Sequence, residues 1–215
     1  MTSKLQKDIF LAGEGDAWVE RNRKILFAKD WVKQDLLFTE LSLLKLPENT
    51  RVLEIGCGEG SRMAKFKSLY GWECHGIEPS KKGVEIARSM GINAVQGTAD
   101  KLPWDDSYFD LVLFGFCLYL CDRADLFKIA AEADRVLRKP GWLSILDFYS
   151  KKPSKNAYEH YPGLNSYKMD YRKLFDWHPL YECYQHKIVD HVSFDITDEE
   201  NNWIAVSILR KKDLT

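Results

Sequence analysis

The segment Val52-Leu-Glu-Ile-Gly-Cys-Gly-Glu-Gly60 constrains the fold of this chain more than any other part of the sequence. A short apolar run ends in three alternating glycines, as expected where a buried parallel strand turns into a helix. Glycines allow a tight turn and let the backbone approach a ligand with no Cβ in the way. In doubly wound sheets, ligands bind at this edge of the strands. The spacing is G-x-G-x-G, which differs from the G-x-G-x-x-G pattern of dinucleotide-binding proteins.

Strands and helices alternate after this loop. The expected strands are 52–55, 73–77, 94–96, 111–114 and 142–148, and the expected helices are 61–70, one capped by Ser80, and one with an apolar stripe over 126–137 that Asp122 caps. Such alternation implies right-handed crossovers and a parallel sheet covered on both faces. Two further β-like runs, 184–194 and 203–209, predict an antiparallel hairpin. We therefore expect an α/β, doubly wound, Rossmann-like fold with a seven-stranded mixed sheet.

The chain of 215 residues suits one domain. We expect a helical N-terminal cap over residues 1–46, a cofactor-binding core over 50–148, and the hairpin within 181–211. Residues 149–180 are rich in Tyr, Lys, His, Asn and Pro. This stretch is too long and too aromatic for a plain connection, so we interpret it as a substrate lid.

Composition excludes several kinds of partner. There are 31 basic and 32 acidic residues, so no basic excess is present to neutralise a nucleic-acid backbone. The start of the sequence lacks the apolar stretch of a signal peptide, and the longest apolar run, 111–121, is too short to span a bilayer. The five cysteines are scattered without a C-x-x-C pair, which favours reduced thiols over a zinc site. We expect a cytoplasmic monomer or homodimer that uses no metal and has no nucleic-acid or membrane partner.

Glu78 strengthens the case for a nucleoside ligand. It lies 20 residues after Gly58, at the end of the second expected strand. A carboxylate there can accept hydrogen bonds from both hydroxyls of a ribose. A carboxylate stabilised by a helix N-terminus is the simpler alternative, and the glycine loop favours ligand binding.

Four motifs occur in order along the chain: the glycine loop, His75-Gly-Ile-Glu-Pro-Ser80, Gly97-Thr-Ala-Asp-Lys-Leu-Pro-Trp104 with Phe109-Asp-Leu-Val112, and Arg135-Val-Leu-Arg-Lys-Pro-Gly141. On these motifs, residues 50–148 resemble the class I S-adenosylmethionine-dependent methyltransferases of the group that includes the ubiquinone and menaquinone methyltransferases. The resemblance implies S-adenosylmethionine as cofactor and a small-molecule methyl acceptor.

The resemblance also implies roles for individual residues. The methionine portion and the sulfonium would be lined by Gly56, Cys57, Gly58 and Gly60, and Glu54 would position the methionine amino end. The ribose would be held by Glu78 with Pro79, and the adenine edge would be met by Thr98, Ala99 and Asp100. The methyl donor would be flanked by Phe114, Gly115 and Phe116, which follow or end the fourth expected strand. Many relatives carry an acidic residue at the position of Thr98, so the side chain that meets the adenine amino group stays open. Phe114 is equally well explained as core.

The acceptor side carries fewer signals. Many relatives have a His pair shortly after the fourth strand, where this chain has Leu118-Tyr119-Leu120. Tyr119 is a poor base at neutral pH, so His160 and His178 are the better candidates for a general base, although each is also explained as a structural or solvated histidine. Trp18 and Arg23 are candidates to close the cofactor site, and a surface ion pair explains Arg23 equally well.

Short matches outside the core suggest an acceptor. Phe10-Leu-Ala-Gly-Glu-Gly-Asp16 with Glu20-Arg-Asn22, and Phe148-Tyr-Ser-Lys-Lys-Pro153 with Tyr167-Lys-Met-Asp-Tyr171, are similar to methylases associated with pseudaminic acid biosynthesis. This similarity implies a sugar or nucleotide-sugar intermediate of surface-glycan assembly. Two alternatives stay open. One is an NAD(P)-dependent oxidoreductase, which the glycine spacing disfavours. The other is a non-catalytic S-adenosylmethionine-binding scaffold, which the absence of the His pair favours.

Overall fold

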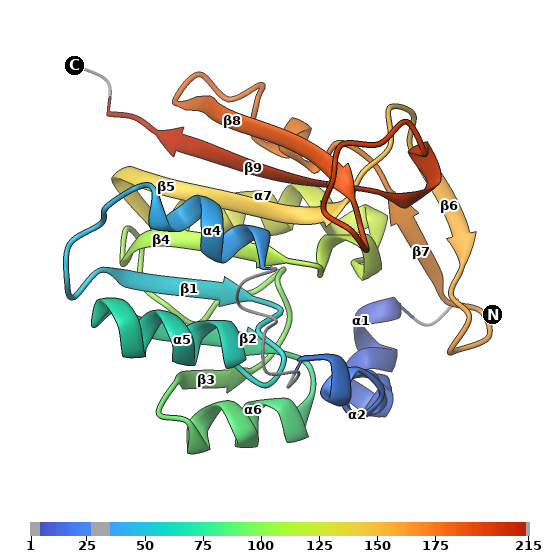
Figure 1. The fold of residues 1–215 in the computed structure, drawn as a ribbon. Helices are drawn as coiled ribbons and strands as arrows, with labels where there is room; N and C mark the ends of the chain where they lie inside the picture. Colours follow the sequence, from blue (N-terminus) through green and yellow to red (C-terminus); the bar gives the residue numbers. More distant parts are fainter. Residues whose placement is uncertain (1–4, 27–34, 214–215) are drawn as a thin grey trace.

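A computed structural model describes residues 5–26 and 35–213. Its centre is a seven-stranded sheet in the order β3-β2-β1-β4-β5-β9-β8 (Figure 1). The bounds are β1 Arg51–Ile55, β2 Glu73–Glu78, β3 Asn93–Gln96, β4 Phe109–Gly115, β5 Leu137–Phe148, β8 Tyr181–Asp190 and β9 Trp203–Lys211. The first five strands run parallel, and β9 pairs antiparallel with both β5 and β8. The predicted mixed sheet with its C-terminal hairpin is confirmed.

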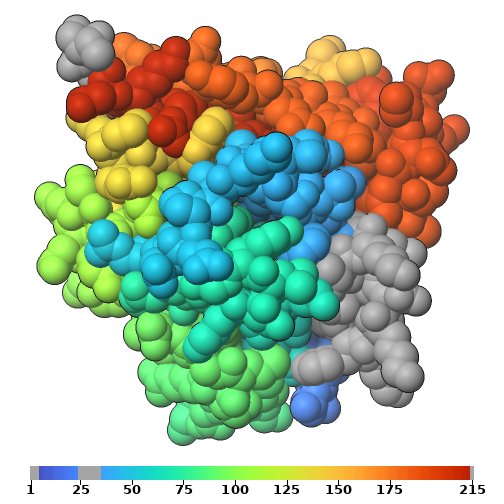
Figure 2. All heavy atoms as spheres, turned by 60° about the vertical axis from the view of Figure 1, so that its left-hand side comes forward, coloured from blue at the N-terminus to red at the C-terminus, as the bar shows by residue number. Residues whose placement is uncertain are grey.

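Helices cover both faces of the sheet. The α-helices are α1 Gln6–Ile9, α2 Gly15–Leu26, α4 Leu36–Ser42, α5 Ser61–Tyr70, α6 Lys81–Ser89 and α7 Leu126–Val136, and the short helical turns are η1 Phe10–Glu14, η2 Leu118–Leu120, η3 Arg123–Asp125, η4 Tyr171–Leu174 and η5 Glu200–Asn202. One core cluster joins α4, α5 and α6 to the sheet, and the other joins α7 and η4 to its opposite face. Figure 2 shows α4 lying between the C-terminal strands and α5.

Apolar runs explain why the central strands form. Leu111, Val112, Leu113 and Phe114 are all fully buried, as a strand covered on both faces requires. The predicted cap of α6 is present, since the hydroxyl of Ser80 accepts a hydrogen bond from the backbone N–H of Gly83.

The predicted cap of α7 is wrong. Asp122 precedes η3 and makes no side-chain cap, and α7 begins only at Leu126. The carboxylate of Asp122 instead accepts from the backbone N–H groups of Gln6 (2.9 Å) and Lys7 (3.0 Å). These are unpaired donors in the first turn of α1, so a distant helix competes for the capping side chain.

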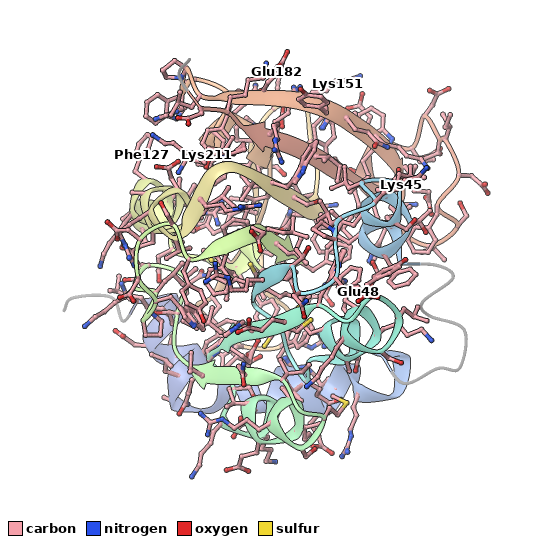
Figure 3. The ribbon with its side chains drawn as sticks, turned by 90° about the vertical axis from the view of Figure 1, so that its left-hand side faces the viewer. Lys45, Glu48, Phe127, Lys151, Glu182 and Lys211 are labelled. Carbon is pink, nitrogen blue, oxygen red and sulfur yellow. The ribbon has the colours of Figure 1, made fainter. Side chains whose placement is uncertain are left out.

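The C-terminal hairpin is fastened to α7 by a buried lysine. Lys211, at the end of β9, is 3% exposed. Figure 3 labels Lys211. Its ammonium donates to the carbonyls of Asp134 (2.6 Å) and Leu137 (2.9 Å) and pairs with the Asp134 carboxylate (2.9 Å). A buried ammonium is stable when it is paired and hydrogen-bonded in this way, which connects the last strand to the core.

Residues 149–180 contain a small sheet that no sequence pattern had indicated. Strands β6 Ser154–Ala157 and β7 Asn165–Lys168 pair antiparallel. Together with α1 and α2 they lie at the end of the large sheet to which the parallel strands point (Figure 1). Over the described residues, no helix is long and apolar enough to cross a membrane.

Candidate cofactor and acceptor site

The three glycines of the loop after β1 all have left-handed backbones, but they serve different purposes. A Cβ on Gly56 (φ +76°) would lie 2.5 Å from Cβ of Cys117, and one on Gly60 (φ +76°) would lie 2.9 Å from Cβ of Ala87. These two glycines therefore allow close packing. A Cβ on Gly58 (φ +53°) would meet no atom nearer than Cζ3 of Trp18 at 4.0 Å. The loop is thus open at Gly58, where a ligand has room.

The carboxylate of Glu78 lies across this loop. Its two oxygens accept hydrogen bonds from the backbone N–H groups of Gly58 and Ser80, each at 2.9 Å. Burial raises the pKa of Glu78 to about 7, although the same hydrogen bonds lower it. Each carboxylate oxygen can accept more than one hydrogen bond, so Glu78 retains acceptor capacity for two hydroxyls.

A narrow cavity of about 100 Å³ extends from Glu78 past the ends of β2 and β3. Its lining includes Pro79, Thr98, Ala99 and Asp100, and α1, η1 and α2 close it from the other side with Lys7, Phe10, Gly15 and Trp18. This is the cavity in which the sequence analysis places the adenine.

Asp100 is already engaged in this cavity. One oxygen accepts from the hydroxyl of Thr98 (2.6 Å), and the other pairs with the ammonium groups of Lys7 (2.7 Å) and Lys128 (3.2 Å). Burial alone would raise the pKa of Asp100, but these hydrogen bonds hold it well below its ordinary value. Lys7 also pairs with Asp125 at 2.7 Å.

A wider cleft of about 720 Å³ begins at the glycine loop and reaches the β6–β7 hairpin. At the loop end, Glu54 pairs with Arg62, whose guanidinium also pairs with Asp35 at 2.7 Å. Burial raises the pKa of Glu54 to about 7, while the charge of Arg62 lowers it.

Buried oxygens without hydrogen-bond partners gather at the same end of the cleft. Among the described residues, Oε2 of Glu54, both carboxylate oxygens of Glu59 and Oγ of Ser61 have none. Within residues 5–26 and 35–213, Glu59 forms an ion pair with Arg23, with Nε and Oε1 3.4 Å apart. Unsatisfied buried acceptors are costly, and an ammonium group would satisfy several of them.

The residues therefore fit S-adenosylmethionine. The remaining acceptor capacity of Glu78, the open face of Gly58 and the unpartnered oxygens match the ribose, the sulfonium and the methionine amino group, respectively. Trp18, Gly56 and Phe116 line both cavities, so they stand where the adenosine and methionine portions would meet. An aromatic face favours a cation at that point.

The far end of the wide cleft is mostly aromatic. Its lining there includes Tyr119, Phe148, Tyr158, His160, Tyr167, Lys168, His191 and Phe194. The indole N–H of Trp18 donates to the hydroxyl of Tyr119 across the cleft (3.3 Å). Burial raises the pKa of Tyr119 beyond its ordinary value, so its phenol stays protonated and is a hydrogen-bonding group rather than a base.

Most of the predicted site residues come together around the two cavities. Those that line one or the other are Glu54, Gly56, Cys57, Gly58, Glu78, Pro79, Thr98, Ala99, Asp100, Gly115, Tyr119 and His160. Phe114, Gly60 and His178 are not brought there. Phe114 is fully buried in the core against Phe175 (ring centroids 6.3 Å apart), and the ring of His178 contacts Trp177 and Tyr181.

His191 is a cleft residue that the sequence analysis missed. It follows β8 directly, and its ring packs edge-on against Phe148 (5.0 Å) and Phe116 (5.7 Å). Burial lowers the pKa of His191, so the ring is neutral at pH 7 and can accept a proton. The sequence predicts residues 184–194 as a single strand, and nothing in that pattern indicates that His191 lines a cleft.

Comparisons with known proteins agree with this geometry. Residues 53–145 match the model of the methyltransferase domain family. The uncharacterized methyltransferase YcgJ of Bacillus subtilis is 29% identical over 165 residues, which cover 72% of this chain and 64% of that protein. The ubiquinone/menaquinone biosynthesis C-methyltransferase UbiE of Vibrio vulnificus is 32% identical over 123 residues, which cover 52% of this chain and 46% of that one. The chain thus spans less than two thirds of these relatives.

Solved structures share the fold. A complex between the Trm112 methyltransferase activator of Haloferax volcanii and a methyltransferase contains a chain with a TM-score of 0.69 and 18% identity, covering 94% of this chain and 97% of that one. The structure of YcgJ from Bacillus subtilis has a TM-score of 0.61 and 20% identity, covering 83% and 98%. Residues 53–145 therefore match the methyltransferase domain family, as the four motifs imply, and the chain shares its fold with solved methyltransferases.

Proposed function

We propose that this protein transfers the methyl group of S-adenosylmethionine to a small-molecule acceptor held in the aromatic cleft. One observation carries the proposal: Glu78 is bound to the backbone of Gly58 beside a set of unpartnered buried acceptors. When bound, S-adenosylmethionine supplies an electrophilic methyl group on a sulfonium. The protein then has to align the acceptor with that methyl group and exclude water.

Residues of both cavities can hold the cofactor and align the acceptor in this way. Trp18 and Phe116 form the wall at the junction of the cavities, Glu54 holds the methionine amino group and Glu78 holds the ribose. An acceptor hydroxyl has to lose its proton, and two histidines, His160 and His191, line the cleft where such a group would stand. His191 thus takes the place of His178 as the second candidate base, because His178 is not among the residues that line the cleft.

The acceptor that we favour is a sugar or a nucleotide sugar of surface-glycan assembly. The similarity of residues 10–22 and 148–171 to methylases associated with pseudaminic acid biosynthesis supports this choice. Aromatic rings interspersed with polar side chains suit a sugar, whose faces are apolar and whose edges carry hydroxyls. Cytoplasmic location and a monomeric or homodimeric state stay predictions.

Calorimetry with S-adenosylmethionine, S-adenosylhomocysteine and NAD separates the candidate functions. We expect both adenosyl compounds to bind and NAD to bind far more weakly; tighter binding of NAD would instead support an oxidoreductase. A second assay offers labelled S-adenosylmethionine with nucleotide sugars, with sugar acids and with a metabolite extract of the source organism. Binding of the cofactor without transfer of the label to any of these acceptors would favour a scaffold.

Cofactor affinity should depend on pH through Glu78. The ribose hydroxyls donate to the ionised carboxylate, whereas the free protein keeps Glu78 protonated below its pKa of about 7. A proton must then leave on binding, so the contribution of Glu78 to affinity for S-adenosylhomocysteine should rise about tenfold per pH unit from pH 5 to 7 and level off above. Titration calorimetry across this range measures it. The variant Glu78→Gln should lack this part of the slope; an unchanged slope would contradict the assignment.

We propose further that residues 5–26 form a cap that opens for the cofactor. The cap is latched by Lys7, which is 24% exposed in its side chain and pairs with Asp100 and Asp125. The variant Lys7→Met should raise the dissociation rate of S-adenosylhomocysteine about tenfold, since hydrogen bonds to charged groups are worth about 1.5–3 kcal/mol.

Lys128→Met is a matched control, because Lys128 pairs with the same oxygen of Asp100 from α7, which is not part of the cap. Its side chain is 59% exposed, so its loss should change the rate by less than about threefold. Stopped-flow fluorescence of Trp18 and its neighbours follows the release. Equal rates in the two variants would show that Lys7 acts only through the charge near Asp100 and not as a latch.

A further inference from the structure

One face of the β6–β7 hairpin presents three polar side chains to the wide cleft. Asn156 of β6 stands opposite Ser166 of β7, and Lys168 follows two residues later. Directly opposed residues of an antiparallel pair share a face, and so do residues two apart on one strand. All three line the cleft, together with Phe148 beneath them.

These side chains are hydrogen-bond donors whose capacity is largely unused. The ammonium of Lys168 donates to the carbonyl of Asn201 and stands 5.6 Å from the ring centre of Phe148. Within the described residues it has no carboxylate partner, and neither the amide of Asn156 nor the hydroxyl of Ser166 has a hydrogen-bond partner. Ser166 and Lys168 are half-buried.

A half-buried ammonium without a counter-charge is costly, because burial removes water that it would otherwise bind. The same burial lowers the pKa of Lys168. An anionic ligand group would remove that cost by supplying the missing charge and the acceptors for three donors.

Charge along the cleft is arranged to match such a ligand. The carboxylates of Asp35, Glu54 and Glu59 lie around the glycine loop, where the methionine amino group belongs. Among the described lining residues, Lys168 supplies the cation at the opposite, hairpin end, and the carboxylate at this end, Glu159, is exposed.

We propose that Asn156, Ser166 and Lys168 form a subsite for an oxyanion of the methyl acceptor, a carboxylate or a phosphate. The inference rests on the proposed function, because it names a part of the acceptor. It also assigns the hairpin a role in specificity: neutral acceptors of the same shape would leave the half-buried Lys168 without a counter-charge.

The test is an NMR titration of the protein saturated with S-adenosylhomocysteine, so that the cofactor site is filled. The probes are inorganic phosphate, pyrophosphate and glucuronate, with glucose as the neutral control. We expect the oxyanions to shift the amide signals of residues 154–168 and glucose to leave them unchanged. Tighter binding of pyrophosphate would indicate a phosphate group, and tighter binding of glucuronate a carboxylate.

The variant Lys168→Met should weaken oxyanion binding by about tenfold or more, since it removes a charged hydrogen-bond donor. Lys155→Met is the matched control, because Lys155 directly precedes Asn156 on β6 of the same hairpin and does not line the cleft. It should change the affinity by less than about twofold.

Equal losses in the two variants, or no oxyanion binding to the unmodified protein, would overturn the subsite. The outcome is separable from that of the proposed function, which fails if the unmodified protein does not bind S-adenosylhomocysteine at all. Both lysine variants should bind S-adenosylhomocysteine with unchanged affinity, which verifies that each is folded.

Discussion

Replacing Glu78 with glutamine should reduce the affinity for S-adenosylhomocysteine by roughly a hundredfold or more. The carboxylate is expected to accept from two ribose hydroxyls, and hydrogen bonds to charged groups are worth about 1.5–3 kcal/mol each. Glutamine also offers only one acceptor oxygen for the backbone N–H groups of Gly58 and Ser80, which both bind Glu78. The loop and the ribose therefore lose a shared partner. Calorimetry on the folded variant measures the loss.

The control for this experiment is Glu73→Gln. Glu73 begins the same strand, β2, and is an exposed residue whose carboxylate contacts His75 at the opposite end of the strand from the cavity. The same chemical change there should leave the affinity within about twofold. If Glu78→Gln bound S-adenosylhomocysteine as tightly as the control, the ribose assignment would be refuted.

Replacing Gly56 with alanine should lower the free energy of unfolding by about 2–5 kcal/mol. The left-handed backbone (φ +76°) costs a non-glycine residue about 1–2 kcal/mol. The new Cβ would also lie 2.5 Å from Cβ of Cys117, and such overpacking costs about 1–3 kcal/mol. Urea unfolding followed by circular dichroism gives the difference, and many single domains have little more stability than this to lose.

Gly58→Ala separates the two contributions. Its backbone is also left-handed (φ +53°), but its Cβ would meet nothing nearer than 4.0 Å, so only the backbone cost of about 1–2 kcal/mol should appear. In the double variant Gly56→Ala, Cys117→Gly the overlapping atom is gone, so part of the loss should be recovered. Similar losses for Gly56→Ala and Gly58→Ala would mean that the contact with Cys117 relaxes without cost.

The parts of this structure that follow from the sequence depend on short-range rules. Val52, Leu53 and Ile55 are apolar and directly precede the glycines, so this local pattern is enough to indicate a buried strand followed by a turn. Ser80 caps its helix through a residue three positions later. Glu78 could be assigned from its distance to Gly58 along the sequence, because the βαβ unit sets where the second strand ends.

What could not be predicted depends on contacts between distant segments. Strands β6 and β7 are four residues long and mostly polar, with no alternation that separates them from a loop. Lys7 meets Asp100 only after α1 folds onto the sheet edge, and Asp122 is diverted to the same helix. His191 faces the cleft because β8 ends one residue earlier. Each of these positions depends on packing that local sequence does not record.

The place of β9 has a consequence for the order in which the sheet can be completed. β9 follows all other strands along the chain, yet it lies between β5 and β8 and pairs with both. Until residues 203–211 are synthesised and released from the ribosome, β5 has an open edge and β8 has no neighbour to join. While residues 149–211 are being made, a growing chain therefore exposes the unpaired backbone groups of the β5 edge, a state that is prone to aggregation. The segment that completes the hairpin is also the one that removes this edge.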